Sequence, residues 1–139
     1  MRFMIIMEAS QAHYDAMAGK GSATAKPWEP DELQAMFSFM DDLNEELVAR
    51  GEWVDAQGLS APALARRVQR VDGEAIVTDG PYAETKEVLA GYWIVDVESI
   101  DRATEIAARV TTCPGPGGEI DGMPVDIRPI PDGPVAPDA

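Results

Sequence analysis

The fold is decided by a continuous apolar run in the second half of the chain, Val88-Leu89-Ala90-Gly91-Tyr92-Trp93-Ile94-Val95-Asp96-Val97. A second run of this kind, Phe3 to Met7, lies near the N-terminus. Neither run alternates strictly between apolar and polar residues, so both indicate strands that are buried on two faces. Working outward from them, the sequence predicts a helix after each strand.

The helix after the first run is predicted over residues 30–50. Pro30 suits the first helical position, Asp31 and Glu32 complement the positive end of the helix dipole, and Gly51 supplies the stop. Apolar residues recur there at helical spacing and predict one inward stripe: Leu33, Met36, Phe37, Met40, Leu43, Leu47 and Val48. Ser99 is predicted to cap the second helix, over residues 100–110.

Shorter elements lie between and after these helices. Residues 66–71 and 74–78 flank Asp72-Gly73, a pair that favours a tight β-hairpin. Further strands are predicted over residues 52–59 and 125–130, with Pro129 favouring an edge position for the last. Residues 10–26 are rich in glycine and hydroxyl side chains and are predicted to form a long loop.

The element order is β-α-β, an inserted hairpin, then β-α-β. It predicts an α+β fold of the ferredoxin-like split βαβ type with an inserted β-hairpin, in one domain over residues 1–130 with a frayed tail over 131–139. Two helices cover only one face of such a sheet, yet both apolar strands need cover on two faces. We therefore predict a homodimer in which the bare faces pack together. The alternative is that the loop 10–26 folds over that face.

Composition excludes several classes of function. Lys and Arg number 11 against 25 Asp and Glu, a net charge of −14. Such a surface repels phosphate backbones and anionic lipids, so neither nucleic acid nor membrane is an expected partner. One His and one Cys cannot make a zinc site, and there is no phosphate-binding glycine loop, so we predict no metal and no cofactor. The single Cys113 and the absence of a long apolar stretch favour a cytoplasmic protein.

One segment carries a family resemblance, Thr78-Asp79-Gly80-Pro81-Tyr82-Ala83-Glu84-Thr85-Lys86-Glu87. It resembles the signature of the DGPF branch of the YCII-related proteins, with Tyr82 in place of the more usual phenylalanine. The resemblance extends through Gly91-Tyr92-Trp93 and residues 126–130. It implies a dimeric α+β barrel, and a regulatory association, because genes of this family often accompany extracytoplasmic-function sigma factors. Some relatives carry a His–Asp pair proposed to be catalytic, but here the sole histidine, His13, lies in the predicted loop.

The candidate site is the signature and its surroundings. Asp79-Gly80-Pro81 has a sufficient explanation as a turn. The following side chains bring donors, acceptors and both signs of charge to the start of a buried strand, where sites are often found. The candidate ligand-binding residues are Asp79, Tyr82, Glu84, Thr85, Lys86 and Arg128. Glu84, Lys86 and His13 are the candidate catalytic residues, through acid–base chemistry or by binding an anion.

Three functions remain open at this stage. The first is a homodimeric small-molecule-binding or regulatory protein, with an unidentified ligand in a pocket near the signature turn. The second is a cofactor-free enzyme of isomerase, lyase or oxygenase type, which is an argument from fold analogy. The third is an interaction partner of a sigma factor, which the acidic surface would contact.

Overall fold

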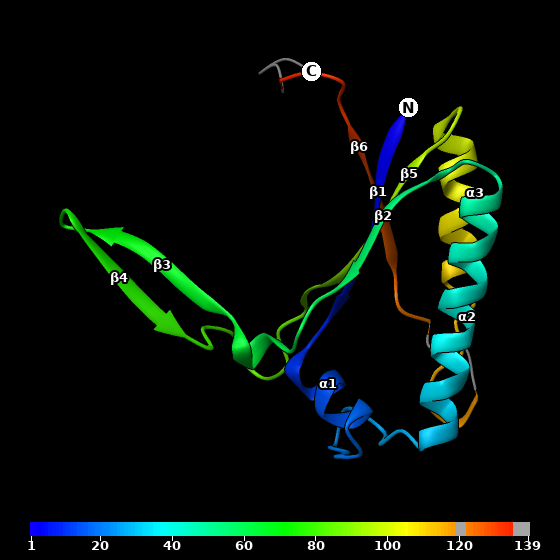
Figure 1. The fold of residues 1–139 in the computed structure, drawn as a ribbon. Helices are drawn as coiled ribbons and strands as arrows, with labels where there is room; N and C mark the ends of the chain where they lie inside the picture. The colour runs from blue at the N-terminus through cyan, green and yellow to red at the C-terminus, as the bar shows by residue number, and fades with distance from the viewer. Residues whose placement is uncertain (119–121, 135–139) are drawn as a thin grey trace.

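The computed structural model describes residues 1–118 and 122–134 (Figure 1). Its elements follow in the order β1 (Arg2–Ala9), α1 (Gln11–Met17), α2 (Pro30–Ala49), β2 (Trp53–Gly58), η1 (Pro62–Leu64), β3 (Arg66–Val71), β4 (Glu74–Asp79), β5 (Val88–Asp96), α3 (Ile100–Val110), η2 (Pro116–Gly118) and β6 (Val125–Ile130). The α+β class is confirmed, and so are the predicted strands, the hairpin and both long helices. The predicted tail over 131–139 lies partly outside the described residues.

Four strands form one sheet in the order β2-β5-β1-β6, and every neighbouring pair is antiparallel. The two apolar runs supply its inner strands, β1 and β5. Pro129, which has no N–H to donate, lies in the edge strand β6 as predicted.

Helices α2 and α3 lie side by side against one face of this sheet (Figure 1). Between them and the sheet lies the main core, which consists of Phe3, Ile5, Leu43, Leu47, Trp93, Val95, Val97, Ala103, Ile106, Ala107 and Val110. The small Ala103 and Ala107 let α3 approach the sheet closely. Both helices begin where predicted, at Pro30 and after the Ser99 cap, whose side chain accepts a hydrogen bond from the Arg102 amide. The structure adds a reciprocal capping box between Glu29 and Glu32 on α2.

The prediction of a loop over residues 10–26 is wrong in its first half, where α1 forms. Ser10 caps this helix by accepting a hydrogen bond from the His13 amide at 3.2 Å. Ala12 and Ala16, four residues apart, are buried and fix the inner face of α1. In so short a helix, these two alanines are the only sign of helical periodicity. The loop was predicted mainly from the glycines that follow them.

The predicted stripe of α2 is too wide. Met36, Leu43 and Leu47 are buried, but Phe37 is 52% and Val48 is 61% exposed. Each follows a buried residue directly, and a turn of about 100° per residue carries it away from the sheet. Val48 therefore offers a surface position on α2, and Phe37 lies at the rim of the space under that helix.

The second face of the sheet is not covered by any described helix (Figure 1). Cross-strand pairing places Met4 opposite Ile94, and Ile6 opposite Tyr92, on this face. Asp55, Gln57, Asp126 and Arg128 border them on β2 and β6. The described part of the chain thus has an open sheet and no closed barrel.

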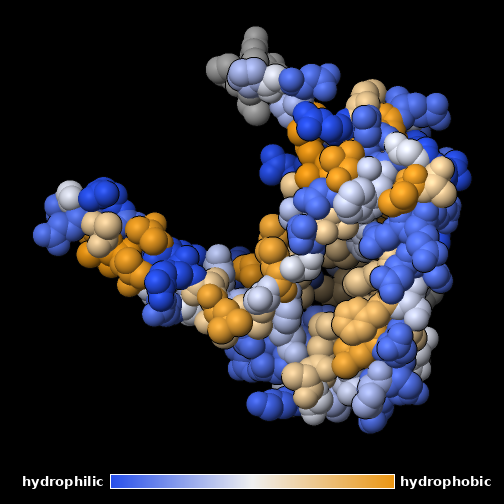
Figure 2. All heavy atoms as spheres, viewed as in Figure 1, coloured by the Kyte–Doolittle hydropathy of each residue, from blue (hydrophilic) through white to orange (hydrophobic). Residues whose placement is uncertain are grey.

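The hairpin β3–β4 projects from the body as a separate arm (Figure 1). Asp72 and Gly73 both have positive φ, 49° and 82°, which is the backbone of a type I′ turn. Every residue of the two strands is exposed, including Val68 at 63% and Val77 at 55%. Figure 2 shows the apolar patch that these side chains help to form on the arm. Among the described residues, no helix is long and apolar enough to cross a membrane.

Candidate ligand-binding cavity

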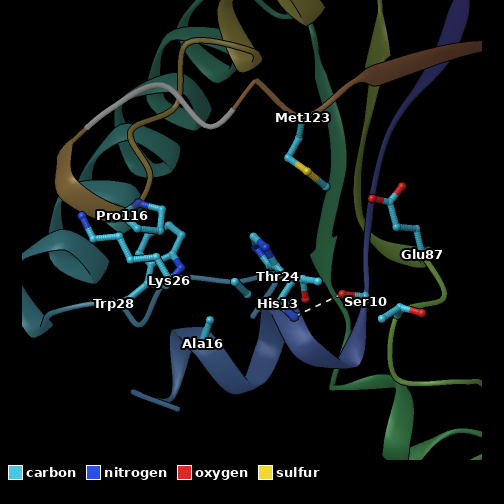
Figure 3. Close-up of a pocket in the computed structure, with 11 residues that line it drawn as sticks. Ser10, His13, Ala16, Thr24, Lys26, Trp28, Glu87, Pro116 and Met123 are labelled. Carbon is cyan, nitrogen blue, oxygen red and sulfur yellow. Dashed lines mark hydrogen bonds between the residues drawn. The ribbon is translucent and has the colours of Figure 1, made fainter. Parts of the chain in front are cut away.

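Two adjoining cavities lie between α1, α2, the sheet and the segment after α3. The first has a volume of about 420 Å³, and Figure 2 shows a hollow between the sheet and α2. Its lining is mainly apolar, and five methionines contribute to it: Met7, Met17, Met36, Met40 and Met123. The second has a volume of about 460 Å³ and a more polar lining, which includes Ser10, Thr24, Lys26, Thr85 and Glu87 (Figure 3). His13, Trp28 and Met123 line both cavities, so these are two parts of one site.

Helix α1 forms the floor of this site. The Ala12 amide donates a hydrogen bond to the Glu84 carbonyl at 3.1 Å, which ties α1 to the signature segment. The Trp28 amide donates to the Ala16 carbonyl at 2.9 Å and brings the chain back under α2. His13 then meets the Trp28 ring edge to face, with 6.2 Å between the ring centroids. No described residue hydrogen-bonds to the imidazole nitrogens of His13, and the ring points into the same space as Met123 (Figure 3).

Tyr14 anchors the cavity wall near the start of β5. Its hydroxyl donates to the Leu59 carbonyl at 2.8 Å, close to the bulge where the pairing of β1 with β5 shifts after Met7. Burial raises the pKa of the Tyr14 hydroxyl, so this group stays a neutral donor at physiological pH. Gly91 at this bulge is required by space: a Cβ there would lie 3.1 Å from the Gln57 carbonyl oxygen.

The inner wall holds one strong polar pair. The Trp93 indole N–H donates to Oδ1 of Asn44 at 2.6 Å, joining β5 to α2. Trp93 is 4% exposed, so the bond satisfies a donor that would otherwise be buried unpaired. Asn44 lines the apolar cavity beside Trp93.

The structure separates the predicted site residues. Asp79 lies at the foot of the arm and pairs with Arg66, whose Nε is 2.8 Å from Oδ1. The Arg67 guanidinium lies 5.2 Å from the centre of the Tyr82 ring. Both arginines belong to β3, so the start of the signature is joined to the arm. Asp79 and Tyr82 are absent from the lining of either cavity.

Thr85 is the one predicted ligand-binding residue that lines a cavity. Glu84 holds α1 through its backbone carbonyl while its side chain is exposed, and Lys86 is exposed too. Arg128 lies on the open face of the sheet opposite Met4. His13, the third catalytic candidate, does line the site, in company with Thr85.

The methionines and Asn44 were not recognised from the sequence as site residues. Met36 and Met40 were assigned to the apolar core stripe of α2, because the sequence alone does not distinguish an apolar residue that lines a cavity from one that packs in the core. The sequence feature that could have indicated an adaptable apolar site is the number of methionines, seven in 139 residues.

Comparison with known proteins agrees with the resemblance drawn from the signature. A model of the YCII-related domain family matches residues 1–115. The chain is also similar to an uncharacterized protein of Rhizobium meliloti (strain 1021), with 25% identity over 114 residues, which cover 82% of this chain and 92% of that protein. The segment matched by the family model includes β1 to α3, the signature segment and most residues of both cavities.

Proposed function

Because the chain belongs to the YCII-related family, we propose that it is a homodimeric small-molecule-binding protein whose ligand occupies the cavity between the sheet and its helices. The observation that carries this proposal is the cavity itself: an apolar space of about 420 Å³ that opens toward a more polar space of similar size. Ligand sites of folded proteins commonly have volumes of about 300–1,000 Å³ and combine an apolar lining with a few polar groups.

The lining suits a ligand better than it suits a packing defect. A space this large admits water, so without an occupant its apolar lining stays in contact with water, and an apolar ligand would remove that contact. Methionine side chains are flexible and polarisable, and five of them allow the walls to adapt to a guest. His13 places a polar ring where the two spaces join, and no described residue forms a hydrogen bond with that ring.

The dimer is supported by the uncovered face of the sheet. The strand order β2-β5-β1-β6 is the one expected for the ferredoxin-like split βαβ arrangement, in which helices cover one face. On the other face, Met4, Ile6 and Ile94 form an apolar centre bordered by Asp126 and Arg128. A border with both signs of charge is self-complementary, as an isologous two-fold contact requires. Two such faces in contact would make the dimeric α+β barrel.

The exposed surface of the hairpin arm also supports contact with a second copy of the chain. An isolated two-stranded hairpin is only marginally stable in water, and this one exposes valines and an isoleucine. Arg66, Arg67 and Arg70 place three of the chain's 11 basic residues on β3. A partner that combines apolar and acidic surface fits it, and a chain with a net charge of −14 supplies such a surface.

The binding function is tested by thermal-shift screening of a fragment library against three proteins. Met40→Trp fills the cavity, and Val48→Trp adds the same ring on the exposed side of the same helix. A ligand at a hundred times its Kd adds about 2.7 kcal/mol of stability, roughly 8 °C for a domain of this size. We expect hits on the wild type and on Val48→Trp that Met40→Trp loses. If no fragment shifts the wild type, or if Met40→Trp keeps the hits, the proposal fails.

A cofactor-free enzyme is a second candidate, and the His13 imidazole favours it. This ring faces the cavity and has no hydrogen-bond partner among the described residues, so both of its nitrogens are available to a bound molecule for general acid or base chemistry. Fragments that bind are incubated with a trace of protein and followed by NMR for new signals. We expect His13→Asn to stop any conversion while fragments still bind. Conversion by His13→Asn at the wild-type rate would remove His13 from the chemistry.

A further inference from the structure

Asn44 presents an unused donor to the apolar cavity. An indole N–H can only donate, so the bond at 2.6 Å fixes the oxygen of the Asn44 amide toward Trp93. Its Nδ2 therefore carries two N–H groups away from Trp93, and no described residue accepts from them. Nδ2 is also not sealed inside protein, because no fully buried side-chain nitrogen or oxygen among the described residues lacks a partner. Asn44 lines the apolar cavity, which is an open space within reach of Nδ2.

The charged side chains of the site lie mainly in the adjoining polar space, which Lys26 and Glu87 line, and not in the apolar cavity beside Asn44. Its lining contains no lysine or arginine, and Glu8, its one carboxylate, is exposed on β1. An anion would lose its hydration without gaining a cation, in a chain whose net charge is already −14. A cation would meet the positive edge of the Asn44 amide. An uncharged guest avoids both costs.

Volume and lining set the size and shape of that guest. A cavity of about 150 Å³ holds one benzene molecule, so about 420 Å³ has room for roughly two to three rings. Methionine sulfur makes favourable contacts with aromatic rings, and Trp28, Phe39 and Trp93 add aromatic surface to the walls. A flat ring system gains from both kinds of wall.

We propose that the ligand is an uncharged, mainly aromatic molecule of two to three rings that carries a hydrogen-bond acceptor such as a ketone oxygen, and that the Asn44 amide N–H recognises this acceptor. This inference rests on the binding function proposed above and names the chemical class of its ligand. The methionines hold the ring system, and Asn44 selects for the polar substituent. This donor distinguishes between molecules of equal shape.

Three probes of matched shape test the inference: 2-acetylnaphthalene has the acceptor, 2-ethylnaphthalene lacks it, and 2-naphthoate carries a charge in its place. Dissociation constants are measured for each by titration calorimetry. We expect 2-acetylnaphthalene to bind roughly two- to tenfold tighter than 2-ethylnaphthalene, the range of one neutral hydrogen bond, and 2-naphthoate to bind most weakly.

The Asn44→Asp variant keeps an oxygen for Trp93 and replaces the free N–H₂ with a second oxygen. We expect it to lose the preference for the acetyl probe over the ethyl probe. In case this carboxylate destabilises the fold, Asn44→Leu combined with Trp93→Phe removes both partners of the bond, leaves no orphan donor, and is expected to lose the same preference. Gln34→Leu removes an exposed amide outside the cavity and is the control that keeps it.

The outcomes separate this inference from the function on which it rests. Equal binding of the acetyl and ethyl probes to the wild type, with both lost in Met40→Trp, would leave the binding site in place and overturn the proposed ligand class. Tightest binding of 2-naphthoate, or a preference that survives in both Asn44 variants, would overturn the class as well. If none of the three probes binds the wild type, while library fragments still shift its melting temperature, the ligand class alone fails. If library fragments fail as well, both proposals fall.

Discussion

Replacing Ile94 with arginine should separate the proposed dimer. Ile94 lies at the centre of the open sheet face, opposite Met4 on one side and Asp55 on the other. Ile94 is already partly buried within one chain, so we take about 1–2 kcal/mol of the roughly 1.5–3 kcal/mol that full burial of an isoleucine contributes. A two-fold contact contains the residue twice, so Ile94→Arg removes about 2–4 kcal/mol per dimer, before any cost of burying the new charge.

That loss of free energy corresponds to a dimer dissociation constant that is roughly 30- to 1,000-fold larger. Sedimentation velocity over a series of concentrations measures it, since the protomer mass is 15.0 kDa and the dimer has twice that mass. Val48→Arg, at a position 61% exposed on α2, places the same charge outside the interface and should associate as the wild type does. A wild type that sediments as a 15.0 kDa particle, or an Ile94→Arg variant with wild-type association, would refute the reasoning.

Three further predictions concern stability and the arm. Arg102 forms two hydrogen bonds of 2.8 Å to the Glu52 carboxylate, which hold the pKa of that carboxyl below its ordinary value of 4.5. Urea unfolding of Arg102→Met should therefore show a loss of about 1–2 kcal/mol that is complete above about pH 5. The loss should shrink as the pH falls from 4.5, where the unfolded chain begins to protonate Glu52, through the lowered pKa of Glu52 in the folded protein; a difference that does not depend on pH would contradict the assignment. Ser99→Ala removes the α3 cap and should cost about 1 kcal/mol in the same assay, with no loss counting against it. Exchange of Val68 and Val77 for threonine should weaken dimerisation in sedimentation, while the melting temperature of a monomeric Ile94→Arg background changes by less than its error, because both valines are exposed in one chain.

Much of the fold follows from local sequence because its signals are local. The Asp72-Gly73 turn, the Ser99 cap and the start of α2 at Pro30 each depend on a few neighbouring residues, and each lies where it was predicted. The two apolar runs form the inner strands β1 and β5, whose alternate residues Phe3, Ile5, Trp93 and Val95 pack in the core under the helices. α1 was missed because a seven-residue helix with two buried alanines carries almost no periodic signal.

The candidate site was harder to predict because it is assembled from distant parts of the chain. His13, Asn44 and Met123 come together only once α1 turns back under α2 and the chain after α3 crosses them. The signature segment does contribute, through Thr85 in the lining and through the carbonyl of Glu84, which holds α1. Its polar side chains stand out in the sequence, whereas the apolar lining looks like ordinary core.

The most direct test of the central claim uses the methionines as reporters. The protein is labelled with carbon-13 at its methionine methyl groups, and 2-acetylnaphthalene is added while the methyl signals are followed by NMR. Five methionines line the cavity, whereas Met1 and Met4 do not. The account predicts that the signals of those five shift together with one dissociation constant, while Met1 and Met4 stay in place. Shifts confined to Met1 and Met4, or no shift at a saturating concentration, would contradict it.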